Sequence, residues 1–598
     1  MSRASAIWVS GPVMRARPEG SFQLRESVTV GERRLLGEVI RIARDEITVQ
    51  LYEDTSGLRP GVLVEGTGRP LSVRLGPGIL SRIFDGLLRP IGDPSDPYVQ
   101  PGLCRIEPQR FHFEPGVRVG DRVSPGGSIG TLSNGTALDL RCLIPPGHPP
   151  GEVVEILDAG RYLDDEPLCR LRADDGSPHA VTMSHEWPVR VPRPVAARLP
   201  SDQPMLTGQR LIDCLFPVAR GGTGAIPGGF GTGKTVLLET VAKWCDADLI
   251  VYVGCGERGN EMAGLLAEFS ELEDPRTGRP LMERTLVIAN TSNMPVSARE
   301  ASIYTGITVA EYFRDQGLAV TLMADSTSRW AEALREVSGR LGELPGEGGY
   351  PAYLSSRLAD FYERAARVRT LGGDLGSVTL LGAVSPPSGD FSEPVTTHTK
   401  RYVGCLWGLD AKRAQARFYP AINPLNSYSL VAERLARWWH TQGCTRWQEL
   451  RSRFLTLLEE ESRLERMARI IGRDAMPARQ RALLICAQLV NEGFLRQSAF
   501  SENDRYASPE RQAVMMRLIG SFLEGTERLL DAGIAPERIA EDPVYRRLTR
   551  MGEEIPDGDW DAFAAIDREL TAVVRRLIDA GRESGEGVGD SRDGTDAM

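Results

Sequence analysis

The sequence lacks the features that membrane-spanning, secreted and zinc-dependent proteins need. Its longest apolar stretches, such as residues 378–384, are much shorter than the roughly 20 residues of a membrane span. Residues 1–9 lack the apolar region of a signal peptide. The nine cysteines form no CxxC pair and the six histidines form no HExxH motif. This pattern indicates reduced core thiols in a cytosolic protein and argues against a zinc site.

Basic residues are also scarce relative to acidic ones. The 71 Lys and Arg against 81 Asp and Glu give a net charge of −10, which argues against a protein held to nucleic acid mainly by a basic surface. Of the 598 residues, 41% are hydrophobic and 25% are charged. The chain is therefore long enough for about two to four domains, each with its own core.

The character of the sequence changes several times along the chain. Up to about residue 75, and again from about 110 to 190, short β-type runs alternate with Gly- and Pro-rich turns, as in small barrels or sandwiches. After Pro204, apolar runs alternate with helical stretches, which is typical of a buried, mostly parallel sheet. These runs are residues 249–253, 286–289, 318–323 and 378–383. From about 430 to 580 the spacing of apolar residues is helical, and the polar stretch 582–598 is expected to be disordered.

A Gly-rich loop in the third region matches the phosphate-binding pattern GxxxxGK[ST]. In such a loop, backbone N–H groups converge on phosphate oxygens, the lysine reaches the β- and γ-phosphates, and the hydroxyl binds Mg²⁺. The apolar run that ends at Asp325 supplies the carboxylate expected at such a Mg²⁺ site. The alternatives are a chance Gly-rich turn and an aspartate that only caps the next helix, but the two elements together favour nucleotide binding. The loop residues are Gly228, Gly229, Phe230, Gly231, Thr232, Gly233, Lys234 and Thr235.

A second polar loop follows the apolar run at 249–253 and contains Glu257 and Arg258 between glycines. The Gly-rich phosphate-binding loop is called the P-loop below. If the strand before Glu257 neighbours the strand that leads into the P-loop, Glu257 emerges at the carboxyl end of the sheet, where α/β folds bind ligands. A carboxylate there can polarise the water that attacks a γ-phosphate, and Arg258 can anchor the loop or the phosphates. The alternative is a solvated Glu-Arg pair on a turn, which the strand context and the flanking glycines disfavour.

Several longer motifs make the chain resemble the catalytic A subunits of V/A-type rotary ATPases. They are residues 254–262, 290–302, 325–336, 384–395 and 407–412. The resemblance extends from about residue 7 to about 580. It implies an α/β P-loop NTPase core with an N-terminal β-barrel, an inserted β-rich bulge domain and a C-terminal helical domain. The implied bounds are 1–75 for the barrel, 110–190 for the bulge, 76–109 and 191–430 for the nucleotide-binding domain, 431–581 for the helical domain and 582–598 for the tail.

The resemblance also implies a role for individual residues. The implied phosphate ligand is Lys234, the Mg²⁺ ligands are Thr235 and Asp325, and the catalytic glutamate is Glu257 with its neighbour Arg258. Arg329 matches an arginine that faces the γ-phosphate from the same chain, while Tyr419 and Phe500 fall where the family stacks adenine. From the residues alone, both aromatics would be read as core. Two positions depart from the family pattern, Gly229 where Pro or Ala is common and Ser388 where Gly is usual.

The function implied by the resemblance is rotary catalysis. The chain would bind ATP or ADP with Mg²⁺ and would couple ATP synthesis or hydrolysis to proton or sodium transport. Its partners would be a B subunit in a ring of three A and three B chains, a central shaft, a peripheral stalk and, indirectly, the membrane ion-translocating sector. It would be cytoplasmic and peripheral to the membrane, without a nucleic-acid partner.

Three other classes share parts of this pattern. F-type catalytic subunits and export ATPases share the Gly-Glu-Arg loop, but they do not normally carry the extra β region at 110–190 together with the run Asp-Ser-Thr-Ser-Arg-Trp at 325–330. Noncatalytic B-type subunits are disfavoured by the intact Lys234 and Glu257. An RNA-translocating hexameric ATPase would need exposed aromatics and a basic groove in its barrel, for which Trp8, Arg15 and Arg17 are weak support.

Overall fold

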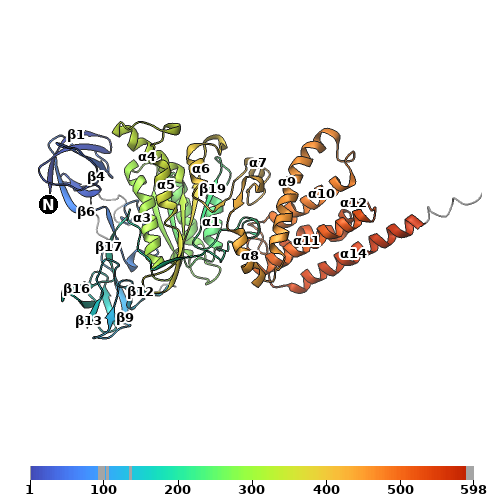
Figure 1. Ribbon diagram of the computed structural model, residues 1–598, viewed down its shortest axis with the longest axis horizontal. Coiled ribbons are helices and arrows are strands. Elements are labelled where there is room, and N and C mark those ends of the chain that lie inside the picture. The colour runs from blue at the N-terminus through green and yellow to red at the C-terminus, as the bar shows by residue number, and fades with distance from the viewer. Residues whose placement is uncertain (1, 92–101, 103–106, 134–137, 587–598) are drawn as a thin grey trace, which may run out of the picture.

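A computed structural model describes residues 2–91, 102, 107–133 and 138–586 of the chain. Figure 1 shows a β-barrel at one end, a second β domain beside it, a central sheet covered by helices, and a helical domain at the other end. This arrangement confirms the fold class predicted from the sequence. None of the described helices is long and apolar enough to cross a membrane.

The N-terminal domain is a closed six-stranded barrel with strand order β1-β2-β5-β4-β3-β6. Small and branched apolar residues on alternate positions, such as Ala4, Ala6, Val28 and Val30, fill its interior. The next strand, β7 (Ser72–Leu75), lies outside the barrel and pairs with β17 (His185–Pro188). The barrel strands are β1 (Arg3–Ser10), β2 (Val13–Pro18), β3 (Glu26–Val30), β4 (Leu35–Ile42), β5 (Ile47–Leu51) and β6 (Leu63–Pro70).

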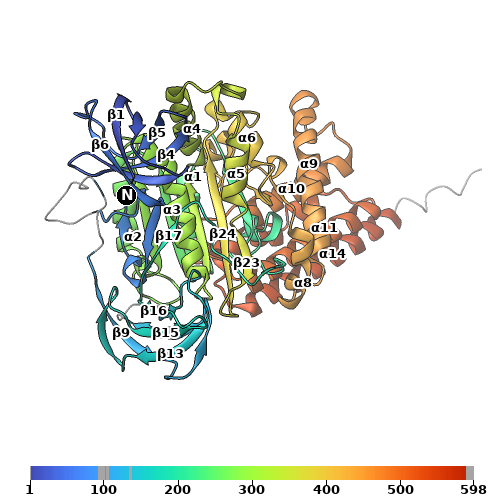
Figure 2. The same ribbon diagram turned by 60° about the vertical axis from the view of Figure 1, so that its left-hand side comes forward.

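The inserted domain consists of two four-stranded antiparallel sheets with orders β10-β13-β15-β16 and β12-β11-β9-β14. In Figure 2 it lies below the barrel and the central sheet. The two-stranded β7–β17 pair joins the chain that leaves the barrel to the chain that leaves this domain. The strands are β9 (Arg110–Pro115), β10 (Arg122–Val123), β11 (Ser128–Ser133), β12 (Leu140–Leu143), β13 (Gly151–Ile156), β14 (Gly160–Leu163), β15 (Cys169–Ala173) and β16 (Pro178–Val181).

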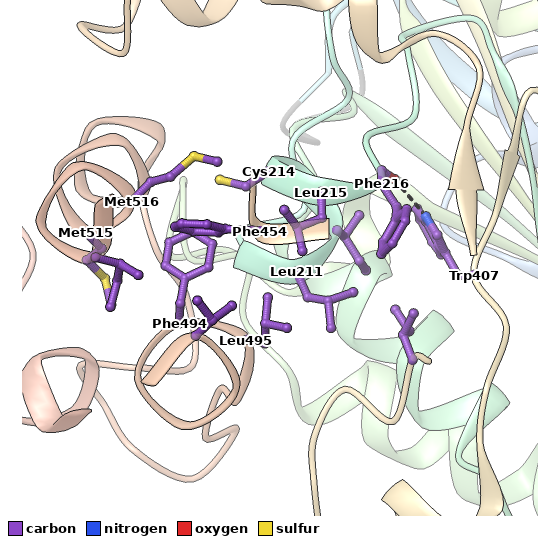
Figure 3. Close-up of a cluster of buried hydrophobic side chains, with 14 of the residues drawn as sticks. Leu211, Cys214, Leu215, Phe216, Trp407, Phe454, Phe494, Leu495, Met515 and Met516 are labelled. Carbon is purple, nitrogen blue, oxygen red and sulfur yellow. Dashed lines mark hydrogen bonds between the residues drawn. The ribbon is translucent and has the colours of Figure 1, made fainter. Parts of the chain in front are cut away.

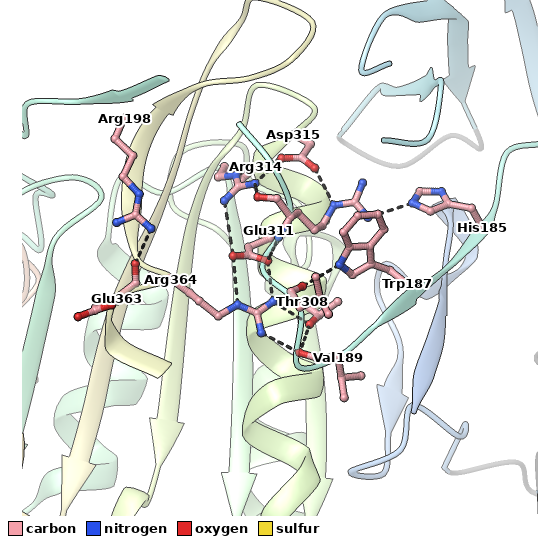
Figure 4. Close-up of polar contacts among 12 residues, drawn as sticks. His185, Trp187, Val189, Arg198, Thr308, Glu311, Arg314, Asp315, Glu363 and Arg364 are labelled. Carbon is pink, nitrogen blue, oxygen red and sulfur yellow. Dashed lines mark hydrogen bonds and ion pairs between the residues drawn. The ribbon is translucent and has the colours of Figure 1, made fainter. Parts of the chain in front are cut away.

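A buried network of charges fixes the base of the inserted domain to the central domain (Figure 4). Arg364 donates to both carboxylate oxygens of Glu311, at 2.6 and 3.1 Å, and to the carbonyl oxygen of Val189 at 2.7 Å. Arg193 pairs with Asp315 at 2.6 Å and contacts His185 at 3.0 Å. Because these charges are paired and hydrogen-bonded, their burial is tolerated, and loss of one partner would leave an uncompensated charge.

The central domain is built on a ten-stranded, mostly parallel sheet with order β26-β25-β19-β24-β22-β20-β21-β8, to which β23 and β18 add at β24. β20, β21 and β22 are buried along their whole length, as expected for strands covered on both faces. The strands are β8 (Ile83–Phe84), β18 (Ala197–Leu199), β19 (Thr223–Pro227), β20 (Leu249–Cys255), β21 (Thr285–Asn290), β22 (Ala319–Asp325), β23 (Ala366–Arg369), β24 (Leu375–Val384), β25 (Cys405–Leu406) and β26 (Tyr428–Ser429).

Two sets of helices cover the two faces of this sheet. α1 and α2 share a core with Ile250 and Tyr252 of β20, whereas α3, α4 and α5 share another core with Val251 and Val253 of the same strand. The alternation along β20 therefore assigns successive side chains to opposite cores. These helices are α1 (Lys234–Trp244), α2 (Gly259–Glu271), α3 (Val296–Arg314), α4 (Thr327–Leu341) and α5 (Leu354–Tyr362), and two short ones follow, α6 (Pro394–Thr399) and α7 (Ala411–Gln415).

The C-terminal domain is helical and shares a continuous apolar core with the α1 and α2 face. Figure 3 shows the junction, where the turn Leu211–Leu215 faces Phe454, Leu495 and Met516. The helix α14 continues to Glu586, into the stretch that the sequence predicts to be disordered, and residues 587–598 lie outside the described part of the chain. The helices are α8 (Ala432–Thr441), α9 (Trp447–Ile471), α10 (Ala478–Leu489), α11 (Pro509–Asp531), α12 (Glu537–Ala540), α13 (Pro543–Glu554) and α14 (Trp560–Glu586).

Candidate active site

The Gly-rich loop connects β19 to α1 at the carboxyl end of the central sheet. Gly231 and Gly233 have φ values of +74° and +85°, in the left-handed region that only glycine adopts without strain. A Cβ on Gly228 would lie 2.6 Å from Oγ1 of Thr232, which itself donates to the Gly229 carbonyl oxygen at 2.8 Å. The glycines thus allow a tight loop whose backbone can approach phosphate oxygens closely.

Lys234 folds back onto this loop. Its Nζ donates to the carbonyl oxygens of Gly228 and Gly229, at 2.8 and 2.9 Å. Burial lowers the pKa of Lys234, while the negative charges of Asp325 and Glu257 oppose that shift. The ammonium group is held by the loop carbonyls within the electrostatic reach of both carboxylates, and phosphate oxygens would replace its two carbonyl partners.

Asp325, at the end of β22, lies next to the P-loop as the sequence predicts. The hydroxyl of Thr235 donates to Oδ2 of Asp325 at 2.9 Å, and the hydroxyl of Tyr252 donates to the same oxygen at 3.1 Å. Sequence reasoning missed Tyr252, although its place on the strand that leads to Glu257 was a usable signal. Burial raises the pKa of Asp325, and the Thr235 and Tyr252 hydrogen bonds partly offset this.

The oxygen donors of Thr235 and Asp325 fit Mg²⁺, which prefers hard oxygen ligands. Within the described residues, no group of three or more His, Cys, Asp or Glu side chains could hold a metal by itself. A Mg²⁺ ion here would therefore take most of its ligands from nucleotide phosphates and water, as is usual for this ion in phosphoryl-transfer sites.

Glu257 lies between β20 and α2, two residues beyond the end of the strand. Burial, and then the negative charge of Asp325, raise its pKa to about 7, while the positive charge of Arg329 acts in the opposite direction. A Cβ on Gly256 would lie 2.8 Å from Cβ of Arg329, so the glutamate loop rests directly on the first turn of α4. A carboxylate whose pKa is near neutrality is suited to accept a proton at physiological pH.

The structure does not bring every predicted residue to this centre. Arg258 is exposed and lies 3.8 Å from Glu261, and its contact with phosphates stays a prediction. Phe230, at the tip of the P-loop, is 91% exposed. Arg329 pairs with Glu332 at 3.2 Å on its own helix, although its charge reaches both Lys234 and Glu257.

A cleft of about 770 Å³ runs from the P-loop to residues 492–504 and 549–553 of the helical domain. Gly233 and Val236 line one end, and Tyr419 and Phe500 line it further along, together with Phe418, which sequence reasoning missed. The Phe500 ring is fully exposed, so it is not a core residue. The volume suits a nucleotide base and ribose, and the aromatic faces suit stacking.

Tyr419 is held in place by the P-loop helix. Its hydroxyl donates to Oγ1 of Thr240 at 2.6 Å, and Thr240 donates to the carbonyl oxygen of Val236 at 2.8 Å. A stacking role alone would need only the ring and would leave the hydroxyl dispensable. In the structure the hydroxyl fixes the ring to α1, the helix that begins at Lys234 of the P-loop. The position of the base site is therefore linked to that of the phosphate site.

We expect Tyr419→Ala to weaken ATP binding by about 1–3 kcal/mol through loss of ring stacking. Tyr419→Phe and Thr240→Val should each weaken it by about 0.5–1.5 kcal/mol, because one hydrogen bond is lost. Calorimetric titration with ATP and with inorganic tripolyphosphate measures both effects, and only ATP binding should change. Equal losses for both ligands would show that the pair supports the phosphate site instead.

The two departures from the family pattern lie beside each other. A Cβ on Gly229 would lie 3.6 Å from Cα of Gly389, an ordinary contact distance, so the loop has room for the larger residues common at this position. Ser388 has a φ of +56°, a left-handed conformation that glycine adopts without strain. Neither position supplies a side chain to the carboxylate and lysine cluster.

Four family models match consecutive parts of the chain, and together they cover most of it. They describe the β-barrel domain of the ATP synthase alpha/beta family (residues 7–68), the barrel-sandwich domain of the ATP synthase alpha/beta chains (106–190), the nucleotide-binding domain of the same family (208–429) and the C-terminal domain of V and A type ATP synthase (436–537).

Curated proteins are similar over nearly the whole chain. The A subunit of the A-type ATP synthase of Thermococcus onnurineus (strain NA1) is 51% identical over 580 residues, which cover 96% of this chain and 98% of that protein. The V-type ATP synthase alpha chain of Halothermothrix orenii is 48% identical over 583 residues, with coverage of 96% and 98%. The chain belongs to the family of catalytic A subunits of A- and V-type ATP synthases. The family resemblance inferred from the motifs is therefore confirmed.

As a member of this family, the protein is the catalytic subunit of a rotary ATP synthase or ATPase, binds ATP and ADP, and works in a complex with other subunits. Among solved structures, the ATPase EscN of the enteropathogenic E. coli type III secretion system has a TM-score of 0.63 at 23% identity, covering 86% of this chain and 99% of that one. That likeness shows a shared fold alone. The much higher identity to A subunits decides against the export-ATPase alternative.

Proposed function

We propose that this A subunit binds ATP with Mg²⁺ between the P-loop and Asp325 and that Glu257 activates the water that attacks the γ-phosphate. The observation that carries the proposal is the 2.9 Å hydrogen bond between Thr235 and Asp325, two residues far apart in sequence. This bond joins the end of β22 to the end of the P-loop, and the charge of Asp325 acts on both Lys234 and Glu257, which supports a shared site for the three residues.

Each residue of the site has a distinct part in phosphoryl transfer. Lys234 would exchange its two carbonyl partners for phosphate oxygens and hold the β- and γ-phosphates in line with the water. Glu257 would take a proton from that water, and Arg329 would stabilise negative charge that develops on the γ-phosphate. Mg²⁺, when it is bound with the nucleotide, neutralises part of the phosphate charge.

We further propose that the reaction is coupled to proton or sodium transport by rotation. Three copies would alternate with three B subunits around a central shaft, on the cytoplasmic face of the membrane. The helical domain would transmit closure of the site to the shaft, because it shares one continuous core with α1, the helix that begins at Lys234. The inserted domain would face outward toward the peripheral stalk, held by the Arg364–Glu311 network.

The partner-dependence of the reaction tests this proposal. An arginine from a neighbouring chain typically adds a rate factor on the order of 10³–10⁵ to phosphoryl transfer. The purified chain should therefore hydrolyse ATP slowly, and addition of its B partner should raise steady-state hydrolysis by at least about 10³-fold. Full activity in a chain shown to be monomeric by light scattering would contradict the shared site.

A further inference from the structure

A second cleft, of about 460 Å³, lies between the N-terminal barrel and the nucleotide-binding domain. Strands β1, β2, β4 and β5 form one wall, and α4, α5 and Glu300 of α3 form the other. Figure 2 shows these barrel strands beside α4. None of the residues assigned above to the ATP site lines this cleft, so its contents would be separate from the reacting nucleotide.

Most carboxylates of the cleft are occupied by partners within the protein. Arg190 pairs with both Glu38 and Glu300, at 3.2 and 2.7 Å, and the three side chains are at most 11% exposed. The carboxylate of Glu343 accepts a hydrogen bond from the hydroxyl of Tyr353 at 3.1 Å. Glu46 is the one further carboxylate among the lining residues. Little negative charge is therefore left to balance the other arginines of the cleft.

Those other arginines stand on both walls. Arg340 pairs with Glu336 at 3.0 Å, and Arg15 lies over the ring of Trp8 at 5.3 Å. Arg25 and Arg41 of the barrel and Arg357 of α5 also line the cleft, and no ion pair joins any of these three to another described residue. The guanidinium of Arg357 lies over the ring of Tyr353, at 5.7 Å. Arg25 and Arg357 line the same cleft as Glu300 from different domains. Burial raises the pKa of Glu300, and Arg190 and then the charges of Arg357 and Arg25 lower it.

A buried amide provides an independent observation. Gln50 of β5 lines the cleft and is only 5% exposed, yet its Nε2 has no hydrogen-bond partner among the described residues. A buried amide donor without an acceptor is unusual in a folded protein, and a ligand oxygen in the cleft would supply one. The remaining surface is apolar and includes Trp8, Ile40 and Leu334.

We infer that this cleft binds a small organic anion that carries two phosphate groups, bridged between Arg25 of the barrel and Arg357 of the nucleotide-binding domain. Planar guanidinium groups match phosphate oxygens in pairs, which favours phosphate over other anions. The volume lies in the range of small-molecule sites, and the apolar wall accommodates a carbon skeleton. The ligand would fasten the barrel to the catalytic domain.

Fructose 1,6-bisphosphate is a suitable probe because it carries two phosphates and no base. We would titrate it by calorimetry into the full chain whose ATP site is filled with a nonhydrolysable ATP analogue. The expected result is one molecule bound per chain, with affinity reduced at least about tenfold by Arg25→Ala and by Arg357→Ala, since each change removes a charge-assisted contact. Arg463→Ala, at an exposed position of α9, should leave the affinity unchanged.

Affinity for the ATP analogue is measured on the same preparations and shows whether each variant is folded. This affinity should not change in the variants, because the ATP site does not include the cleft. Inorganic phosphate at equal concentration should bind much more weakly than the bisphosphate. Binding of both probes with equal affinity would overturn the assignment of an organic ligand. Absence of bisphosphate binding at millimolar concentration, or binding unaltered by Arg25→Ala and Arg357→Ala in folded protein, would overturn the site.

Discussion

Glu257→Gln is expected to lower steady-state ATP hydrolysis by about 10²–10⁴-fold and to leave ATP binding nearly unchanged. The amide has the shape of the carboxylate but cannot accept the proton of the attacking water. The measurement combines hydrolysis by the A–B complex with calorimetric ATP titration of the same variant. If affinity and rate fall together, Glu257 would instead hold the nucleotide or its metal.

Glu261→Gln is a matched control for this experiment. Glu261 lies in the first turn of α2, raises the pKa of Glu257 by its charge, and pairs with Arg258 at 3.8 Å on the exposed side of the loop. Its removal should shift the pH dependence of hydrolysis slightly toward acid without loss of the maximal rate. A collapse of the rate in both variants would mean that the loop needs its charges for structure.

The raised pKa of Glu257 also sets the pH dependence. Because the carboxylate is the reactive form and its pKa is about 7, hydrolysis should rise as the pH increases through 7. At pH values between 4.5, the ordinary pKa of a glutamate, and about 7, Glu257 is protonated in the folded chain but has lost its proton in the unfolded chain. The free energy of unfolding therefore falls as the pH rises through this range. Glu257→Gln should therefore raise the melting temperature of the nucleotide-free chain at pH 8 and have little such effect near pH 4.5.

The parts of the site that lie in continuous segments could be predicted from the sequence. The apolar run that becomes β22 ends at Asp325, and the run that becomes β20 leads to Glu257. Parallel strands deliver both carboxylates to the same edge of the sheet as the P-loop. The assumption that the Glu257 strand neighbours the P-loop strand was wrong, because β24 and β22 lie between β19 and β20. The order of β24, β22 and β20 in the sheet then determines which of them meet.

Contacts between distant segments could not be predicted in this way. The hydrogen bond from Tyr419 to Thr240 depends on where the segment around Tyr419 packs against α1, and that from Tyr252 to Asp325 depends on β20 and β22 being neighbours in the sheet. β7, the last strand of the expected 1–75 barrel region, lies outside the closed barrel and pairs with β17, more than 100 residues further along the chain. A hydrogen bond between single side chains leaves no periodic pattern in the sequence, so its partners can be identified only in the folded chain.

Lys234→Ala is expected to reduce hydrolysis by at least about 10²–10³-fold and, unlike Glu257→Gln, to weaken ATP binding as well. The ammonium group acts on phosphate oxygens in both the bound state and the transition state, so its loss affects affinity and rate together. Its present partners are two loop carbonyl oxygens, and burial already lowers its pKa. The side chain is only partly buried and contacts the loop, not the core, so its removal should leave the melting temperature of the nucleotide-free chain close to that of the parent.

Lys243→Ala separates this effect from a general loss of positive charge, because Lys243 lies on the last turn of the same helix and contacts the ring of Trp244 at 5.5 Å. That variant should hydrolyse ATP at the parental rate. Steady-state hydrolysis by the A–B complex, ATP titration and thermal melting are measured for both variants. Parental turnover in Lys234→Ala would refute the P-loop assignment, whereas a melting temperature lowered by many degrees would make Lys234 a structural residue of the loop and leave the phosphate contact to the backbone amides.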